Sequence, residues 1–164
     1  MLKYTETLVV FAEVPDEVTL AINISNCPNR CPSCHSKYLW DDIGTPLTSF
    51  ELERLINQNS GITCVAFMGG DASPDEVLDL AFLVHEEFGL KTCWYTGRTR
   101  DYWESTDLFP ENYDVLDYVK FGPYDEQYGA LDCKTTNQRF YKVDALEDGT
   151  FGLEDWTPRF YKLR

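Results

Sequence analysis

Three cysteines stand close together near the start of the chain, in the segment Cys27-Pro-Asn-Arg-Cys31-Pro-Ser-Cys34. A loop with this C-x3-C-x2-C spacing can present three thiolates to one metal centre. Structural zinc sites use four ligands, and electron-transfer iron–sulfur clusters usually use four cysteines. Three thiolates on a [4Fe–4S] cluster would instead leave one iron open to a substrate. The spacing therefore favours a cluster that carries out chemistry, held by a loop over residues 26–35.

Two non-catalytic metal sites are the alternatives. His35 could complete a zinc site with the three cysteines, although adjacent residues such as Cys34 and His35 rarely reach the same tetrahedral ion. Cys133 could supply a fourth cluster ligand, which would make the protein an electron carrier. Cys64 and Cys93 fall inside expected strands, and we predict that both are small buried core residues.

Strands and helices that alternate along the chain are predicted to position this loop. β-Branched and apolar runs predict strands over residues 7–14, 18–25, 62–68 and 91–95. Capping patterns predict helices from Thr48 to about residue 59 and from Ser73 to Gly89. A short helix or strand followed by a strand is expected over 113–121, and residues 139–143 and 150–153 could form a closing hairpin.

This order predicts a parallel sheet with a ligand site at the carboxyl ends of its strands. The ends of three predicted strands carry the cysteine loop, Gly69-Gly70-Asp71 and Thr96-Gly97. We therefore expect these three segments to lie at one edge of the sheet.

Composition and length limit the possible classes of protein. The 164 residues suggest a single domain over residues 1–164, shorter than a closed eight-fold β/α barrel of about 250 residues. A net charge of −14 argues against a nucleic-acid-binding or membrane-binding surface. The six cysteines are too few for a disulfide scaffold, and no signal peptide or apolar run of about 18 residues is visible. These features predict a cytoplasmic protein.

Several motifs, taken in order, resemble those of a known family. They are the cysteine triad, Cys34-His35-Ser36-Lys37 through Trp40, Phe67-Met68-Gly69-Gly70-Asp71, Trp94-Tyr95-Thr96-Gly97 and Thr136-Asn137-Gln138. Together they resemble the radical S-adenosylmethionine (SAM) enzymes, and among them the activating proteins of anaerobic ribonucleoside-triphosphate reductase. Many radical SAM enzymes have an aromatic residue at the position of Ser33, although the reductase activases also have a small residue there. The activases usually have an aromatic residue at the position of His35, and here Ala72-Ser73 separate Gly-Gly-Asp from Pro74.

The resemblance implies a fold and an activity. The fold is a partial, incomplete β/α barrel of the radical SAM type with a mainly parallel sheet, open on one side to a protein substrate. The activity is that of an oxidoreductase in which Cys27, Cys31 and Cys34 hold a [4Fe–4S] cluster that cleaves SAM reductively. The resulting radical would remove a hydrogen from a glycine of a glycyl radical enzyme, here anaerobic ribonucleotide reductase. A radical SAM enzyme that acts on another protein or on a small molecule is the alternative. A flavodoxin- or ferredoxin-like protein would supply the electron.

The resemblance also implies which residues bind SAM, with no catalytic residue beyond the cluster ligands. Asp71, with backbone groups of Gly69 and Gly70, would bind the methionine moiety, and Thr96 would contact the methionine or the ribose. Ser33 and His35 would contact the adenine or ribose. Simpler roles are also open: the glycines could only shape a turn, His35 could pack against Trp40, and Thr96 could only end a strand. Three further residues are scarce positive charges that could meet a carboxylate or an acidic electron donor, namely Arg98, Arg100 and Arg139.

Overall fold

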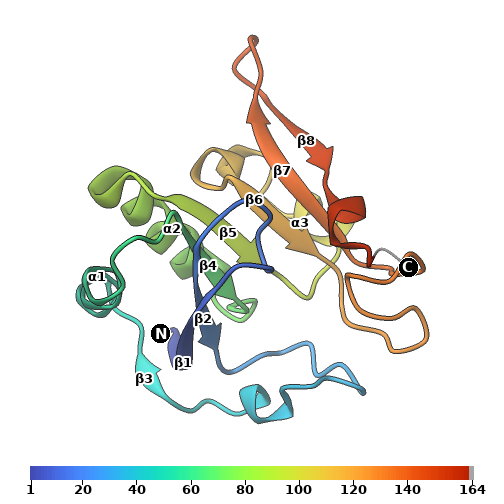
Figure 1. The fold of residues 1–164 in the computed structure, drawn as a ribbon, viewed down its shortest axis with the longest axis horizontal. Coiled ribbons are helices and arrows are strands. Elements are labelled where there is room, and N and C mark those ends of the chain that lie inside the picture. The colour runs from blue at the N-terminus through green and yellow to red at the C-terminus, as the bar shows by residue number, and fades with distance from the viewer. Residues whose placement is uncertain (163–164) are drawn as a thin grey trace.

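The computed structural model describes residues 1–162. The single domain expected over residues 1–164 stays a prediction. Its centre is an eight-stranded sheet with the order β3-β1-β2-β4-β5-β6-β7-β8 (Figure 1). The strands are β1 (Lys3–Val10), β2 (Thr19–Ile24), β3 (Thr45–Pro46), β4 (Cys64–Met68), β5 (Lys91–Tyr95), β6 (Tyr118–Phe121), β7 (Arg139–Ala145) and β8 (Phe151–Asp155). The α-helices are α1 (Ser49–Gln58), α2 (Pro74–Phe88) and α3 (Arg100–Glu104), and the short 3₁₀ helices are η1 (Lys37–Trp40), η2 (Glu111–Val115) and η3 (Thr157–Phe160).

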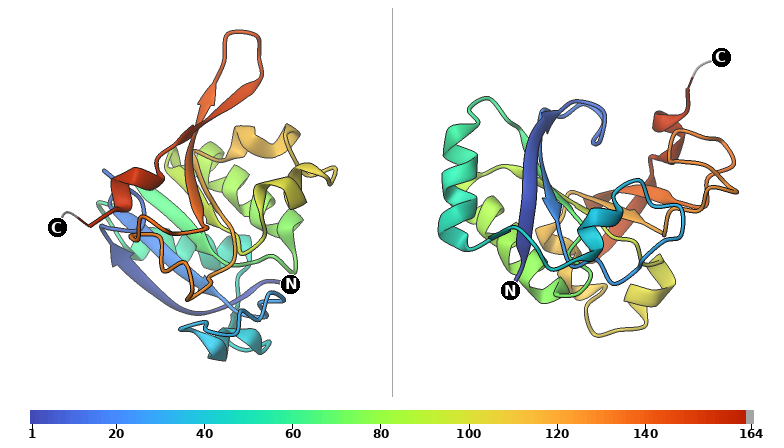
Figure 2. Two further views of the ribbon diagram at one scale, coloured as in Figure 1. Left: turned by 90° about the vertical axis from the view of Figure 1, so that its right-hand side faces the viewer. Right: turned by 90° about the horizontal axis from the view of Figure 1, so that it is seen from below.

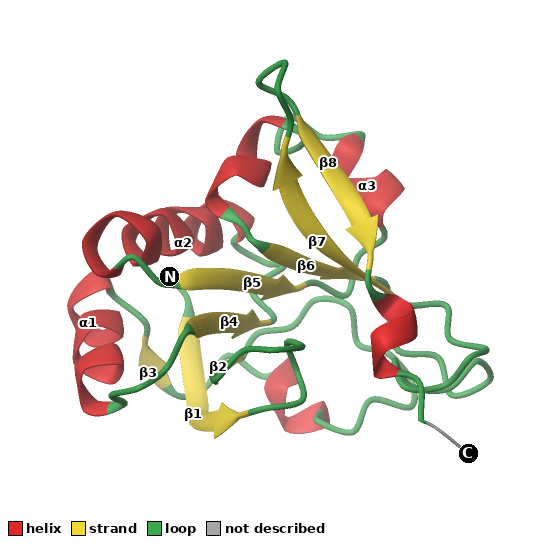
Figure 3. Cartoon of the chain, turned by 45° about the horizontal axis from the view of Figure 1, so that its top comes forward, coloured by secondary structure: helices red, strands yellow, loops and turns green. Residues whose placement is uncertain are grey.

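The sheet is mixed. β2, β4, β5 and β6 are parallel, whereas the other four of the seven neighbouring pairs are antiparallel. The prediction of a mainly parallel sheet in a partial barrel of the radical SAM type is therefore wrong. The connections explain the difference: parallel neighbours usually need a crossover helix, and the segments that join β1 to β2, β6 to β7 and β7 to β8 contain none (Figure 3).

Both long helices form where capping residues predict them. The Thr48 hydroxyl accepts a hydrogen bond from the Glu51 N–H at 3.1 Å, which begins α1. Pro74 opens α2, and Gly89 ends it in the left-handed conformation with φ 59°. Figure 2 shows α1 and α2 on one side of the sheet. These two helix predictions are confirmed.

The two faces of the central strands bury different side chains, because successive residues of a strand point to opposite faces. On the face toward the helices, Val65 and Phe67 belong to the larger hydrophobic core. On the other face, Cys64 and Cys93 pack in a smaller core with Phe140. Both cysteines are fully buried, as predicted, and burial raises the pKa of both thiols. They are therefore poor candidates for reactive or ligating groups.

The carboxyl ends of the four parallel strands meet at one edge of the sheet. β2 leads into the cysteine loop, β4 into Gly69-Gly70-Asp71, β5 into Thr96-Gly97 and β6 into Gly122. The predicted gathering of the first three segments is thus confirmed. Away from this edge, the β7–β8 hairpin projects from the molecule (Figures 1 and 2). Within residues 1–162, no helix has the length and apolar character needed to cross a membrane.

An ion pair joins the end of α2 to the sheet. His85 Nε2 lies 2.7 Å from Asp117 Oδ2, and this oxygen also accepts the Thr92 N–H at 2.9 Å. The hydrogen bond to Asp117 raises the pKa of His85 above its ordinary value. A positive charge in the last turn of a helix is also favourable.

We expect the His85→Gln variant to lose about 1 kcal/mol of unfolding free energy at about pH 5.5 and much less at about pH 9. Because the pKa of His85 is higher in the folded state, its protonated form stabilises the fold. This stabilisation is fully present at pH values below the unfolded-state pKa of about 6.5. This contribution is lost as the pH rises through the folded-state pKa. Urea unfolding of both proteins at the two pH values measures the difference, and equal destabilisation at both would contradict the expectation.

Candidate functional site

The cysteine loop follows β2 and has a defined backbone. The Cys27 N–H donates to the Leu39 carbonyl at 2.9 Å, and the Cys34 N–H donates to the Cys31 carbonyl at 3.0 Å. Asn26 and Arg30 have positive φ values of 59° and 47°, so the chain bends sharply before and between the cysteines. All three thiols are free and half-buried.

Polar groups surround these thiols. The Ser36 N–H donates to Cys34 Sγ at 3.3 Å, and the Asn29 side-chain amide donates to Cys27 Sγ at 3.7 Å. Burial raises the pKa of Cys31, the negative charges of Cys27 and Cys34 raise it further, and a hydrogen bond from the Tyr124 backbone opposes them. The Cys31 thiol is therefore close enough to both other cysteines to be affected by their charge, and N–H donors are in place to stabilise negative charge on sulfur.

Lys120 places a buried positive charge beside this loop, and the sequence analysis did not select it. Lys120 is only 7% exposed. Its Nζ donates to the Gly122 carbonyl at 3.0 Å and lies 5.5 Å from the centre of the Tyr95 ring. Burial lowers the pKa of Lys120 to about 8, against the opposing effect of the negative charges of Asp71, Cys31 and Cys27. A lysine inside the apolar strand Tyr118–Phe121 was the sequence signal that could have identified it.

Asp71 lies against the cysteine loop and has one unused oxygen. The residue is 8% exposed, and its Oδ2 accepts hydrogen bonds from the Asn29 amide and, at 2.8 Å, from the Gly97 N–H. Its Oδ1 is buried with no hydrogen-bond partner among residues 1–162. Buried carboxylate oxygens without partners are energetically costly, so this atom is suited to accept a hydrogen bond from a ligand.

The two glycines before Asp71 are required by backbone conformation and by packing. Gly69 and Gly70 have φ values of 113° and 99°. A Cβ atom on Gly70 would lie 2.4 Å from Val77 Cγ2, and the Gly69 carbonyl already accepts a hydrogen bond from Trp94 Nε1 at 2.8 Å. A tight strand-to-helix turn is therefore sufficient to explain these glycines, and their contact with SAM stays a prediction.

The remaining predicted SAM contacts lie in different surroundings. Ser33 is half-buried next to Cys34, and the exposed His35 lies with its ring 4.9 Å from the Tyr124 ring rather than packing on Trp40. Thr96 is fully buried, and its hydroxyl accepts a hydrogen bond from Trp103 Nε1 at 2.7 Å. Ser33 and His35 therefore lie within the cysteine loop itself, and Asp71 contacts this loop through Asn29, whereas the Thr96 hydroxyl is used inside the fold.

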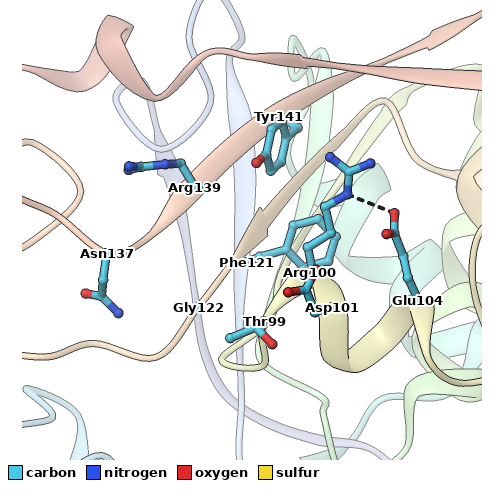
Figure 4. Close-up of a pocket in the computed structure, with 9 residues that line it drawn as sticks. All are labelled: Thr99, Arg100, Asp101, Glu104, Phe121, Gly122, Asn137, Arg139 and Tyr141. Carbon is cyan, nitrogen blue, oxygen red and sulfur yellow. Dashed lines mark hydrogen bonds and ion pairs between the residues drawn. The ribbon is translucent and has the colours of Figure 1, made fainter.

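A pocket of about 360 Å³ lies between α3, the end of β6 and the start of β7 (Figure 4). It is lined by Thr99, Arg100, Asp101, Glu104, Phe121, Gly122, Asn137, Arg139 and Tyr141. Arg100 Nε lies 2.8 Å from Glu104 Oε1, and Arg139 donates to the carbonyls of Thr136 and Gln138. None of the three clustered cysteines lines it, and its arginines have partners within the protein.

The donor set is suited to an iron–sulfur cluster, because all three clustered donors are thiols. Among residues 1–162, no three His, Cys, Asp or Glu side chains converge closely enough to bind one metal ion. Three clustered thiols with N–H donors to sulfur and a nearby lysine are suitable surroundings for an iron–sulfur cluster.

Comparison with models of protein families matches residues 18–143 to the 4Fe–4S single cluster domain family. The chain belongs to this family. The match spans well over half of the chain, including the cysteine loop and Asp71, so the protein is an iron–sulfur protein. Membership of the 4Fe–4S single cluster domain family is also compatible with a redox enzyme. Searches of curated proteins and of solved structures found no match.

Proposed function

We propose that this iron–sulfur protein is a radical SAM activase that generates a glycyl radical on a partner enzyme. In the proposal, Cys27, Cys31 and Cys34 would hold the [4Fe–4S] cluster, and because the protein supplies only three ligands, the cluster would keep a position for SAM. When bound, the cluster would supply the low-potential electron that breaks the S–C5′ bond of SAM. The products would be methionine and, after transfer of one hydrogen atom from a glycine Cα of the partner, 5′-deoxyadenosine.

The observation that carries this proposal is the buried, unpartnered Oδ1 of Asp71 beside the cysteine loop. An N–H of the amino group of SAM is the kind of donor that this oxygen lacks. Asp71 would fix the orientation of the methionine moiety through that bond. Lys120 and the N–H donors from Asn29 and Ser36 would offset the negative charge of the thiolates. These protein groups bind and orient, and they take no part in the electron transfer itself.

The partner enzyme and the electron donor are proposed from the resemblance of the motifs to the reductase activases. The partner is an anaerobic ribonucleotide reductase, and the donor is a flavodoxin- or ferredoxin-like protein. Gly-Gly-Asp, Thr-Gly and Thr-Asn-Gln occur here in the same order as in those activases.

Anaerobic reconstitution followed by reduction in the presence of SAM tests the activity. We expect about four irons per chain and the release of 5′-deoxyadenosine and methionine in equal amounts, measured by chromatography. Incubation with the candidate reductase should then give a glycine-centred radical in its EPR spectrum. A cluster that forms and is reduced but never cleaves SAM would contradict the proposal and favour an electron carrier.

A further inference from the structure

Asn29 connects the cysteine loop to Asp71. Its side-chain Nδ2 lies 3.7 Å from Cys27 Sγ and within hydrogen-bond distance of Asp71 Oδ2. An amide nitrogen carries two hydrogens, so it can serve both acceptors at once. Asn29 is half-buried and lies between the first two cysteines, and no metal-ligand pattern assigns it a role.

Gly97 leaves the space that the Asn29 amide occupies. A Cβ atom at position 97 would lie 2.4 Å from Asn29 Nδ2 and 3.0 Å from Asn29 Cγ, so only glycine permits this approach without displacing the amide. The Gly97 N–H donates to the same Asp71 Oδ2 at 2.8 Å. Two donors therefore hold one carboxylate oxygen, which leaves Oδ1 as the oxygen for a ligand.

We propose that Asn29 is a positioning residue that links the cluster ligand Cys27 to the ligand-binding carboxylate of Asp71. The link rests on the proposed function, because it assumes that a cluster binds Cys27 and that SAM binds Asp71. An N–H donor to a ligating sulfur stabilises the reduced, more negative cluster and raises its reduction potential. The second N–H fixes the rotation of the Asp71 carboxylate, so its free oxygen is oriented before SAM arrives.

Two variants test the link in the reconstituted full-length protein. Asn29→Leu removes both N–H groups and keeps the same number of side-chain heavy atoms in the same branched shape, and Gly97→Ala keeps the amide but displaces it. Asn57→Leu, at an exposed position on α1, is the matched control. The readouts are the midpoint potential of the cluster in an EPR-monitored redox titration without SAM, and the dissociation constant for SAM measured by calorimetry.

We expect both variants to have a more negative midpoint potential than the control and to bind SAM about tenfold more weakly. Gly97→Ala still tests the link if Asn29→Leu fails to assemble a cluster. An unchanged potential or an unchanged SAM affinity in a variant that retains its iron overturns the link. Wild-type protein that holds its cluster but does not bind SAM overturns the proposed function instead, so the two failures are distinguishable.

Discussion

Replacing Cys31 by alanine is expected to abolish the iron–sulfur cluster and reduce SAM cleavage to background. Cys31 is the middle residue of the triad, and the charges of both other thiols act on its own thiol. The wild-type loop supplies three protein ligands for four irons, so one iron has no protein ligand. Without the Cys31 thiolate, two irons would have no protein ligand. Iron analysis, the visible absorbance of the cluster and the 5′-deoxyadenosine assay measure the loss.

Cys133→Ala is the matched control for this experiment. Cys133 lies in the segment between β6 and β7, and its thiol donates to Asp132 at 3.7 Å. We expect this variant to keep about four irons per chain and full SAM cleavage. If Cys133→Ala loses the cluster while Cys31→Ala retains it, the assignment of the triad is wrong. Loss of the cluster in both would favour a four-cysteine electron-carrier cluster.

Local structure was predictable wherever one short segment contains its own signal. Thr48 and Glu51 lie three residues apart and cap α1 through a single hydrogen bond. Gly89 ends α2 because it adopts the left-handed conformation at little cost. The direction of strand pairing contains no such local signal. The direction of pairing depends on whether the chain crosses to the other end of the sheet between two strands. The long segment between β6 and β7 does not cross over, so these two strands pair antiparallel, and no local pattern in the sequence indicates this.

The candidate site was predictable at the level of strand ends and not at the level of side-chain direction. The parallel central strands bring Asp71 to the cysteine loop, as expected from the strand order. Thr96 stands at an equivalent strand end, but its hydroxyl is engaged by Trp103 from α3. Asn29 and Lys120 were missed because their partners lie on other strands or loops, which periodicity and spacing do not reveal.

Replacing Asp71 by asparagine is expected to weaken SAM binding between about tenfold and a hundredfold while leaving the cluster in place. The amide oxygen can still accept the hydrogen bonds from Gly97 and Asn29, so the local geometry is kept. The free carboxylate oxygen becomes an uncharged NH₂ group, which cannot accept a hydrogen bond from the amino group of SAM. The variant therefore separates ligand binding from cluster assembly.

Calorimetric titration of SAM into the reconstituted Asp71→Asn variant measures this loss, with iron content determined on the same sample. Asp79→Asn, an exposed carboxylate on α2, is the control that removes the same charge far from the cysteine loop. Wild-type affinity in Asp71→Asn would show that the buried Oδ1 is not the SAM ligand. Weakened binding at full iron content would assign Asp71 to the ligand rather than to the fold, because a folding defect would lower the iron content as well.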